Sequence, residues 1–222
     1  MIKNQVILFG ATGLIGGHVL QLLLNDPHFH NVIAVTRKPI LFTHKKLRVR
    51  HINFLNLKDI EDCIKDSSVV FSAIGTTQSK VKRDKKSYRE IDFDITYNIG
   101  RACQTHSIEK FLFISSSGAD LSSLNFYLKL KGEVEEAVSK LNLKSLIILR
   151  PSLLLGSRNE FRFGEKIAQI AMPLFSAFLP SHFKPISSEA VSKVMVSFSK
   201  LKSSGNQIIQ NKEILVMSKA NK

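Results

Sequence analysis

A tyrosine and a lysine four residues apart are the first candidates for chemistry in this sequence. Tyr127 and Lys131 lie in a helix-length segment that begins soon after the serine run at residues 115–117. Because positions i and i+4 share one face of a helix, the two side chains are expected to point together. A lysine cation stabilises a neighbouring phenolate, which helps the phenol to give up its proton. The pair therefore predicts acid–base chemistry, with Tyr127 donating a proton to a carbonyl oxygen.

A serine hydroxyl would complete this arrangement by holding the carbonyl oxygen. Ser116 is the preferred residue for this role, and Ser115 is the second candidate. The other tyrosines, Tyr88 and Tyr97, have no lysine at position i+4 and cannot form the same pair. A tyrosine that serves only in packing is the alternative for Tyr127.

A glycine-rich sequence, GATGLIG, occupies residues 10–16 between an apolar run and a helix-length segment. Gly10 permits a tight turn, Gly13 lets the backbone approach a pyrophosphate, and Gly16 lets the helix pack closely on the strand. The amino end of the helix adds free N–H donors and the positive end of a dipole. A turn that binds nothing is the alternative, but the strand–turn–helix context indicates a dinucleotide site.

The end of the second apolar run indicates which dinucleotide is bound. In NAD-binding folds an acidic residue about 20 residues after the first glycine binds the ribose hydroxyls. This chain has Arg37 and Lys38 there instead. A guanidinium can bind a 2′-phosphate with two hydrogen bonds, and a second cation adds to the attraction. The sequence therefore predicts NADP(H) in preference to NAD(H), with two exposed loop cations as the alternative.

Strands and helices alternate along the chain, and the candidate residues follow strand ends. Apolar runs predict strands at residues 6–9, 32–36, 47–52, 69–74, 111–114 and 146–149. Helices are expected at residues 14–25, 59–65, 87–106 and 127–140. This order predicts an α/β fold with a doubly wound parallel sheet, the Rossmann type. Ligands bind at the carboxyl edge of such sheets, so Ile74, Gly75 and Thr76 are expected to line the cofactor.

After Pro151 the alternation ends. Helices are expected at residues 163–172 and 188–201, and a short strand at residues 213–216. We interpret residues 1–222 as one domain in which residues 151–222 form a small lobe on the substrate side. The apolar segment at residues 167–179 would either cap a substrate pocket or subunit contact, or belong to the core.

Composition excludes several other classes of protein. Of the 222 residues, 44% are hydrophobic, and the two cysteines do not form a disulfide scaffold or a metal-binding pattern. The net charge of +14 would attract polyanions. However, the lysines are scattered, and the densest basic run, at residues 80–86, is expected to be a solvated loop. This distribution favours a charged surface over a nucleic-acid site.

The sequence also bears on location. No segment approaches the roughly 18 apolar residues of a membrane-spanning helix. The first residues lead into a strand-like run without the pattern of a signal peptide. A cytoplasmic location is therefore expected.

Several longer segments resemble a known family. They are GATGLIG and TRK near the start, GTTQSK (75–80), SSSGAD (115–120), FYLKLKGEVE (126–135) and LRPSLLLGSRNEFR (149–162). With the Tyr-x3-Lys pair, they resemble the atypical, NADP-binding branch of the short-chain dehydrogenase/reductase superfamily. Within that branch they are most similar to the Tat-interacting-protein oxidoreductases.

This resemblance implies a set of site residues. The implied cofactor contacts are Thr12, Gly13, Leu14, Ile15, Arg37, Lys38, Ile74, Gly75, Leu154 and Arg162. Tyr127 is implied as the proton donor, with Lys131 beside it. Leu154 would pack on the nicotinamide, and Arg162 could reach a phosphate. The chain has Asn53 where the family usually has an aspartate, so the resemblance assigns no adenine contact there.

Two functions are compatible with these residues. One is an NADPH-dependent reductase that acts on a small carbonyl substrate. The other is a non-catalytic NADP(H) sensor that acts through a protein partner, since members of this group have regulatory roles. An intact set of Tyr127, Lys131 and Ser116 favours the enzyme, because a sensor has no need for a phenol beside a lysine.

Overall fold

Short apolar strands form the centre of the molecule. The computed structural model describes residues 5–37, 39–76, 84–155 and 184–220. In these residues seven strands form one sheet, with the order β3-β2-β1-β4-β5-β6-β9 and parallel pairing throughout. The strands are β1 (Gln5–Phe9), β2 (Asn31–Val35), β3 (Leu47–Arg50), β4 (Val69–Ser72), β5 (Lys110–Ile114), β6 (Ser145–Arg150) and β9 (Gly205–Gln210).

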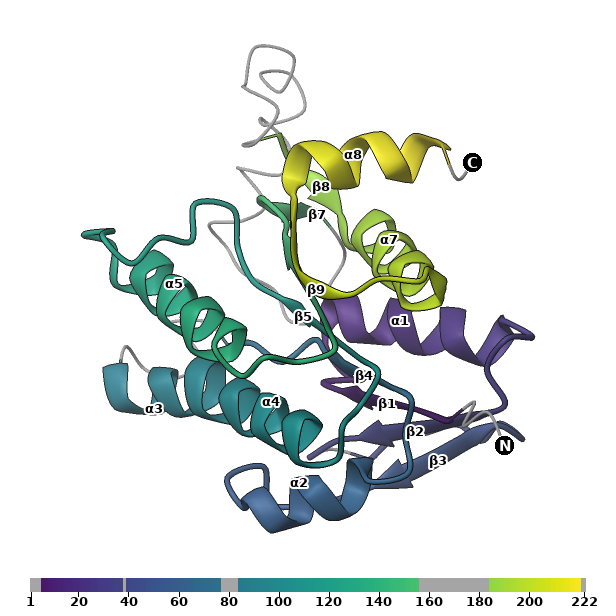
Figure 1. Ribbon diagram of the computed structural model, residues 1–222. Coiled ribbons are helices and arrows are strands. Elements are labelled where there is room, and N and C mark those ends of the chain that lie inside the picture. The colour runs from purple at the N-terminus through teal and green to yellow at the C-terminus, as the bar shows by residue number, and fades with distance from the viewer. Residues whose placement is uncertain (1–4, 38, 77–83, 156–183, 221–222) are drawn as a thin grey trace.

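Helices cover both faces of this sheet (Figure 1). One face carries α2 (Leu57–Ile64), α3 (Lys85–Arg89), the π-helical turn η1 (Glu90–Asp94), α4 (Ile95–Thr105) and α5 (Phe126–Ser139). The other face carries α1 (Leu14–Asn25), α7 (Ser188–Lys200) and α8 (Asn211–Ala220). Within β1, Val6 and Leu8 belong to the core beneath α1 and α7, whereas Ile7 and Phe9 belong to the opposite core. Burial on both faces explains why β1 is apolar at successive positions.

The strand order confirms the predicted doubly wound α/β fold. The order reverses between β1 and β4, and ligands of such sheets bind outside the carboxyl ends of the strands at this point. Phe9 of β1 is in register with Val35 of β2 and with Ser72 of β4. The three loops that follow these strands therefore begin side by side.

Two elements differ from the expectation. The helix expected at residues 87–106 consists of α3, η1 and α4 in succession. The strand expected at residues 213–216 is wrong, because these residues lie in α8 and the last strand is β9. Ile214 is fully buried, whereas Val216 is 62% exposed. Residues two apart would share a face of a strand but lie on different sides of a helix.

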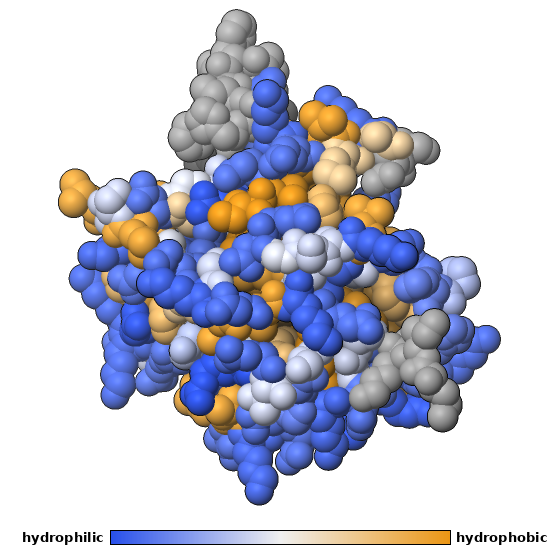
Figure 2. All heavy atoms as spheres, viewed as in Figure 1, coloured by the Kyte–Doolittle hydropathy of each residue, from blue (hydrophilic) through white to orange (hydrophobic). Residues whose placement is uncertain are grey.

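The surface of the molecule is mostly polar on the side shown in Figure 2, with apolar residues visible among the hydrophilic ones. No helix in the described ranges is both long and apolar enough to span a bilayer. The expected helix at 163–172 and the apolar segment at 167–179 lie outside the described residues, as do residues 80–83 of the basic run.

A buried asparagine connects three parts of the chain after β6. Asn211 is fully buried, and its Oδ1 accepts a hydrogen bond of 3.0 Å from the Ser152 N–H. Its Nδ2 donates to the Lys184 carbonyl at 2.9 Å. Next to these contacts, β7 (Leu154–Leu155) and β8 (Ile186–Ser187) form a separate pair of parallel strands. The single side chain of Asn211 thus joins α8 to the segments leading into β7 and β8.

We expect Asn211→Ala to lower the free energy of unfolding by about 1–3 kcal/mol, because it removes the hydrogen bonds from a fully buried side chain to the half-buried Ser152 N–H and Lys184 carbonyl. Urea denaturation followed by circular dichroism would measure the change. Asn206→Ala is the matched control, since Asn206 is exposed and its Nδ2 donates to the Ser139 carbonyl at 3.1 Å. Equal free energies of unfolding for both variants would contradict the role given to Asn211.

Candidate functional site

The turn between β1 and α1 has no space for side chains at Gly10 and Gly16. Gly10 has a φ of +83°, and a Cβ at this residue would lie 2.7 Å from the Ala73 carbonyl oxygen. A Cβ on Gly16 would lie 2.0 Å from the Gly10 carbonyl oxygen, which is far inside van der Waals contact. The Gly13 N–H closes the turn by donating to the Gly10 carbonyl at 2.9 Å. Glycine is therefore required to seat α1 against β1 and β4.

The amino end of α1 is arranged differently from those of four other helices. The side chains of Asn56, Asp84, Asn125 and Ser187 cap α2, α3, α5 and α7. The cap residue of α1 is Gly13, which has no side chain to accept a hydrogen bond, and the first turn of α1 contains no acidic residue. Uncapped N–H groups with a positive dipole end are a good binding site for a phosphate. This cradle fits the pyrophosphate of a dinucleotide.

The residues predicted to bind the cofactor in this turn differ in exposure to solvent. Thr12 and Gly13 are exposed and Leu14 is half-buried. Ile15 is only 6% exposed and packs in the core beneath α1 and α7, so it can offer a ligand only its backbone.

The loop after β2 presents an arginine at the same edge. The Thr36 N–H donates to the Arg50 carbonyl at 3.0 Å, and the Thr36 carbonyl lies 3.0 Å from Nδ1 of His51. These contacts hold the backbone immediately before Arg37, whose side chain is exposed. Lys38 lies outside the described residues. The position of Arg37 suits contact with a ribose phosphate.

The loop after β4 is held through both backbone polar groups of one residue, Thr76. The Thr76 N–H donates to Oδ2 of Asp92 at 2.9 Å, and the Thr76 carbonyl accepts from the Tyr88 hydroxyl at 3.2 Å. Gly75 is exposed, and a Cβ there would lie 3.7 Å from Oδ1 of Asp92. Ile74 is half-buried. This loop therefore borders the glycine cradle in a defined conformation.

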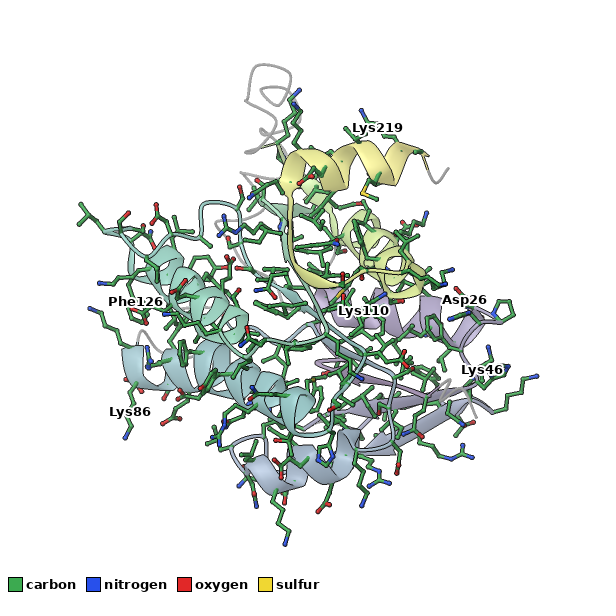
Figure 3. All side chains as sticks on the ribbon, viewed as in Figure 1. Asp26, Lys46, Lys86, Lys110, Phe126 and Lys219 are labelled. Carbon is green, nitrogen blue, oxygen red and sulfur yellow. The ribbon has the colours of Figure 1, made fainter. Side chains whose placement is uncertain are left out.

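The expected tyrosine and lysine lie in the first part of α5. Asn125 caps this helix through hydrogen bonds from the N–H groups of Tyr127 and Leu128, at 2.9 and 3.2 Å. Lys131 Nζ lies 5.8 Å from the centroid of the Tyr127 ring. Phe126, labelled at the start of α5 in Figure 3, packs edge-on against Tyr88 with ring centroids 5.9 Å apart. Aromatic contacts to α3 thus help to orient the start of α5.

Lys131 is paired with an acidic residue that the motif did not include. Its Nζ lies 2.7 Å from Oδ1 of Asp92, and the two side chains are 6% and 1% exposed. Burial alone would lower the pKa of Lys131, but the Asp92 carboxylate and Tyr127 outweigh this effect and raise it above the ordinary value. Lys131 is therefore an ammonium ion inside the protein. The sequence does contain a sign that Asp92 is buried. Asp92 precedes the buried Ile95 and Ile99 by three and seven residues, a spacing that places it on the same helix face, where an apolar residue is expected.

The two candidate serines have different environments. Ser115 is buried and its hydroxyl donates to Glu135, whose carboxylate also accepts hydrogen bonds from Arg150 Nε at 3.0 and 3.1 Å. Ser116 is half-buried, and its Oγ donates to the neighbouring Ser117 carbonyl at 3.3 Å. The hydroxyl of Ser115 is thus used inside the protein, which favours Ser116 for contact with a substrate. Sequence reasoning did not find Glu135 and Arg150.

The remaining predicted contacts fall after β6. Leu154 is half-buried in β7 and packs against the core beneath α1 and α7. Arg162 lies outside the described residues. The basic run was expected to be a loop, but its last two residues, Lys85 and Lys86, begin α3, which Asp84 caps. Lys86 points away from the molecule, as expected of a solvated side chain (Figure 3).

Known proteins resemble this chain in sequence and in fold. Residues 10–198 match the family described as NAD(P)H-binding. The protein FMP52, mitochondrial, of Candida albicans is 30% identical over 96% of this chain and 94% of its own length. The protein of the same name from Saccharomyces cerevisiae is 30% identical over 96% of this chain and 95% of its own length.

Solved structures show the same fold at low identity. MoeE5 in complex with UDP-glucuronic acid and NAD has a TM-score of 0.72 and 19% identity, over 98% of this chain and 82% of that one. The UDP-glucose 4-epimerase of Thermotoga maritima has a TM-score of 0.71 and 14% identity, over 97% of this chain and 82% of that one. These likenesses support the Rossmann-type sheet.

The relatives also correct one expectation from the sequence. Both FMP52 proteins carry the designation mitochondrial, so the expected cytoplasmic location is wrong. The similarity to the Tat-interacting-protein oxidoreductases stays a prediction that rests on the sequence motifs. The family match indicates that the ligand is a nicotinamide dinucleotide. With most of its length matched, the chain belongs to the NAD(P)H-binding family, alongside the FMP52 proteins.

Proposed function

We propose that this protein is an NADPH-dependent reductase of a small carbonyl compound. The observation that carries the proposal is the buried Lys131–Asp92 pair, with 2.7 Å between Nζ and Oδ1, beside the Tyr127 ring. A protein that only bound a dinucleotide would have no use for a buried ammonium next to a phenol. A buried ion pair is often no more stabilising than apolar residues of similar volume, so the presence of this pair favours a chemical role.

The proposed roles follow from the placement of each group. Backbone N–H groups at residues 12–15 bind the pyrophosphate, and Arg37, with Lys38, binds the 2′-phosphate. When bound, the coenzyme would supply the hydride that reduces the carbonyl carbon. Tyr127 donates its phenolic proton to the carbonyl oxygen, which the Ser116 hydroxyl holds. Lys131 stabilises the phenolate that remains and has further N–H donors for the nicotinamide ribose.

NADPH oxidation in the presence of a panel of aldehydes and ketones tests this function. We expect one alcohol to form for each NADPH consumed, as measured by absorbance and by product analysis. Tight NADPH binding without turnover of any carbonyl would reject the reductase and favour the NADP(H) sensor. Because the FMP52 relatives are named mitochondrial, we propose that the protein works in mitochondria, and fractionation of cells that express it would test this location.

We expect Arg37→Asp to weaken NADPH binding by about 100-fold and NADH binding by much less. The exposed guanidinium provides a charge-assisted contact to the 2′-phosphate, and a carboxylate would repel this phosphate. Fluorescence titration of both coenzymes would give the two dissociation constants. Arg48→Asp is the matched control, since Arg48 is also exposed but hydrogen-bonds the Leu47 carbonyl at 3.1 Å on edge strand β3. An equal loss for NADPH and NADH in Arg37→Asp would contradict the NADP assignment.

A further inference from the structure

One carboxylate contacts both halves of the candidate site. Asp92 Oδ1 lies 2.7 Å from Lys131 Nζ, and Asp92 Oδ2 accepts the Thr76 N–H at 2.9 Å. Lys131 belongs to the proton-transfer group on α5, whereas Thr76 follows β4 at the edge where the dinucleotide is bound. Both oxygens of a 1% exposed side chain are therefore used to join these two parts.

A second residue reinforces this connection from the adjoining helix. The Tyr88 hydroxyl donates to the Thr76 carbonyl at 3.2 Å. Tyr88 and Asp92 therefore bind the carbonyl and the N–H of the same residue, Thr76. The Tyr88 ring also packs edge-on against the Tyr127 ring, with centroids 6.1 Å apart. The segment from Tyr88 to Asp92 thus contacts the loop after β4, the lysine and the tyrosine.

The local backbone is unusual at this position. Asp92 lies in η1, the π-helical turn between α3 and α4. Single π turns within helices are rare and are found frequently at functional sites. A buried ion pair is often no more stabilising than apolar residues of similar size, so stability alone does not explain an acid here.

We propose that Asp92 is a positioning residue that couples the dinucleotide-binding loop after β4 to proton transfer by Tyr127 and Lys131. This inference rests on the proposed reductase function. Its carboxylate fixes the Lys131 ammonium through one oxygen and the Thr76 peptide through the other. A displacement of the loop is therefore transmitted to the lysine, and a change at the lysine is transmitted to the loop.

The charge of Asp92 also sets the field around the reacting phenol. Lys131 is faced by Asp92 from η1 and by Tyr127 and Glu135 from α5. Glu135 is itself bound to Arg150, so Asp92 is the direct counter-ion of Lys131. Without this carboxylate, burial would lower the pKa of Lys131 with less opposition, and the ammonium would lose its proton more readily. This effect would reduce activity on the alkaline side.

The test compares Asp92→Asn with Asp94→Asn, the same chemical change two residues along η1 at a half-buried position. We expect Asp92→Asn to lower kcat by about 10- to 100-fold, because the lysine is no longer held in place. The alkaline limb of the pH profile of kcat should move to lower pH, and the NADPH dissociation constant should rise. Asp94→Asn should leave all three quantities at their wild-type values.

Tyr88→Phe provides a second test of the coupling in case Asp92→Asn does not fold. It removes one hydroxyl, keeps the aromatic packing, and should raise the NADPH dissociation constant by about two- to tenfold, the effect of one lost hydrogen bond. A double variant, Asp92→Asn with Lys131→Met, should lose less NADPH affinity than the sum of the single losses in free energy, because the two residues act through one contact.

These readouts separate the coupling from the reductase function. If the wild type binds NADPH without reducing any carbonyl, the proposed function fails. The NADPH affinities of Asp92→Asn, Tyr88→Phe and the double variant then still decide the coupling. Wild-type affinity in Asp92→Asn and Tyr88→Phe, or additive losses in the double variant, would overturn it. In a protein that turns over, an unchanged pH profile in Asp92→Asn would overturn it as well.

Discussion

Tyr127→Phe should lower kcat for carbonyl reduction by about 100- to 10,000-fold, the usual contribution of a positioned general acid. NADPH affinity should stay within about twofold, because the variant removes an interaction that matters only during the reaction. The helix start is preserved, since Asn125 caps α5 through backbone N–H groups. The ring contact with Tyr88, at 6.1 Å between centroids, is available to phenylalanine too. Single-turnover measurements of NADPH oxidation with the best carbonyl of the panel would give the change.

Tyr97→Phe is the matched control for this experiment. Tyr97 is half-buried on α4 and its ring packs against Phe93 with centroids 5.9 Å apart, so it also loses a hydroxyl and keeps a ring contact. It should retain wild-type kcat. Turnover that survives in Tyr127→Phe would show that the proton comes from another group.

Gly16→Ala should reduce NADPH affinity by at least about 100-fold or prevent folding, because its Cβ would lie 2.0 Å from the Gly10 carbonyl oxygen and 2.8 Å from the carbonyl carbon. Both of these atoms are backbone, so the turn can make room only by moving away from the pyrophosphate position. Isothermal titration calorimetry with NADPH would measure the loss, and circular dichroism would show whether the variant is folded.

Gly17→Ala provides a control one residue further along α1. Its Cβ would meet the Ala11 carbonyl oxygen at 3.8 Å, an ordinary van der Waals distance. Alanine is better than glycine inside a helix by about 1 kcal/mol, so this variant should keep NADPH affinity and unfold at a higher temperature. Equal losses in Gly16→Ala and Gly17→Ala would mean that close packing at Gly16 is not the reason for the glycine.

The sheet could be predicted because its signals are local. The apolar runs of the inner strands and the glycine turn each depend on a few consecutive residues, and their alternation with helices implies the parallel order. Strand β9 could not be predicted in this way, since its sequence, GNQIIQ, is polar and only Ile209 is buried. Its pairing with β6 supplies the backbone hydrogen bonds that its composition does not suggest.

Among the reacting groups, a contact between two side chains could be predicted where one helix supplied both partners. Tyr127 and Lys131 are related by helix geometry, which is visible in their spacing. Asp92 comes from a different helix, and only the packing of η1 against α5 brings it to Lys131. Ser116 is preferred from the sequence, but the hydrogen bond that occupies the Ser115 hydroxyl is accepted by Glu135 on α5 and could not be predicted.

The contacts of Ser115, Glu135 and Arg150 join the loop after β5 to α5 and to the end of β6. The Ser115 N–H also donates to the Leu149 carbonyl at 2.8 Å. This amide should therefore exchange its hydrogen with solvent only when the whole domain unfolds, and not through local opening. Adaptation to a new substrate would then have to proceed at other residues of the candidate site, because Ser115 and Arg150 are both held by Glu135.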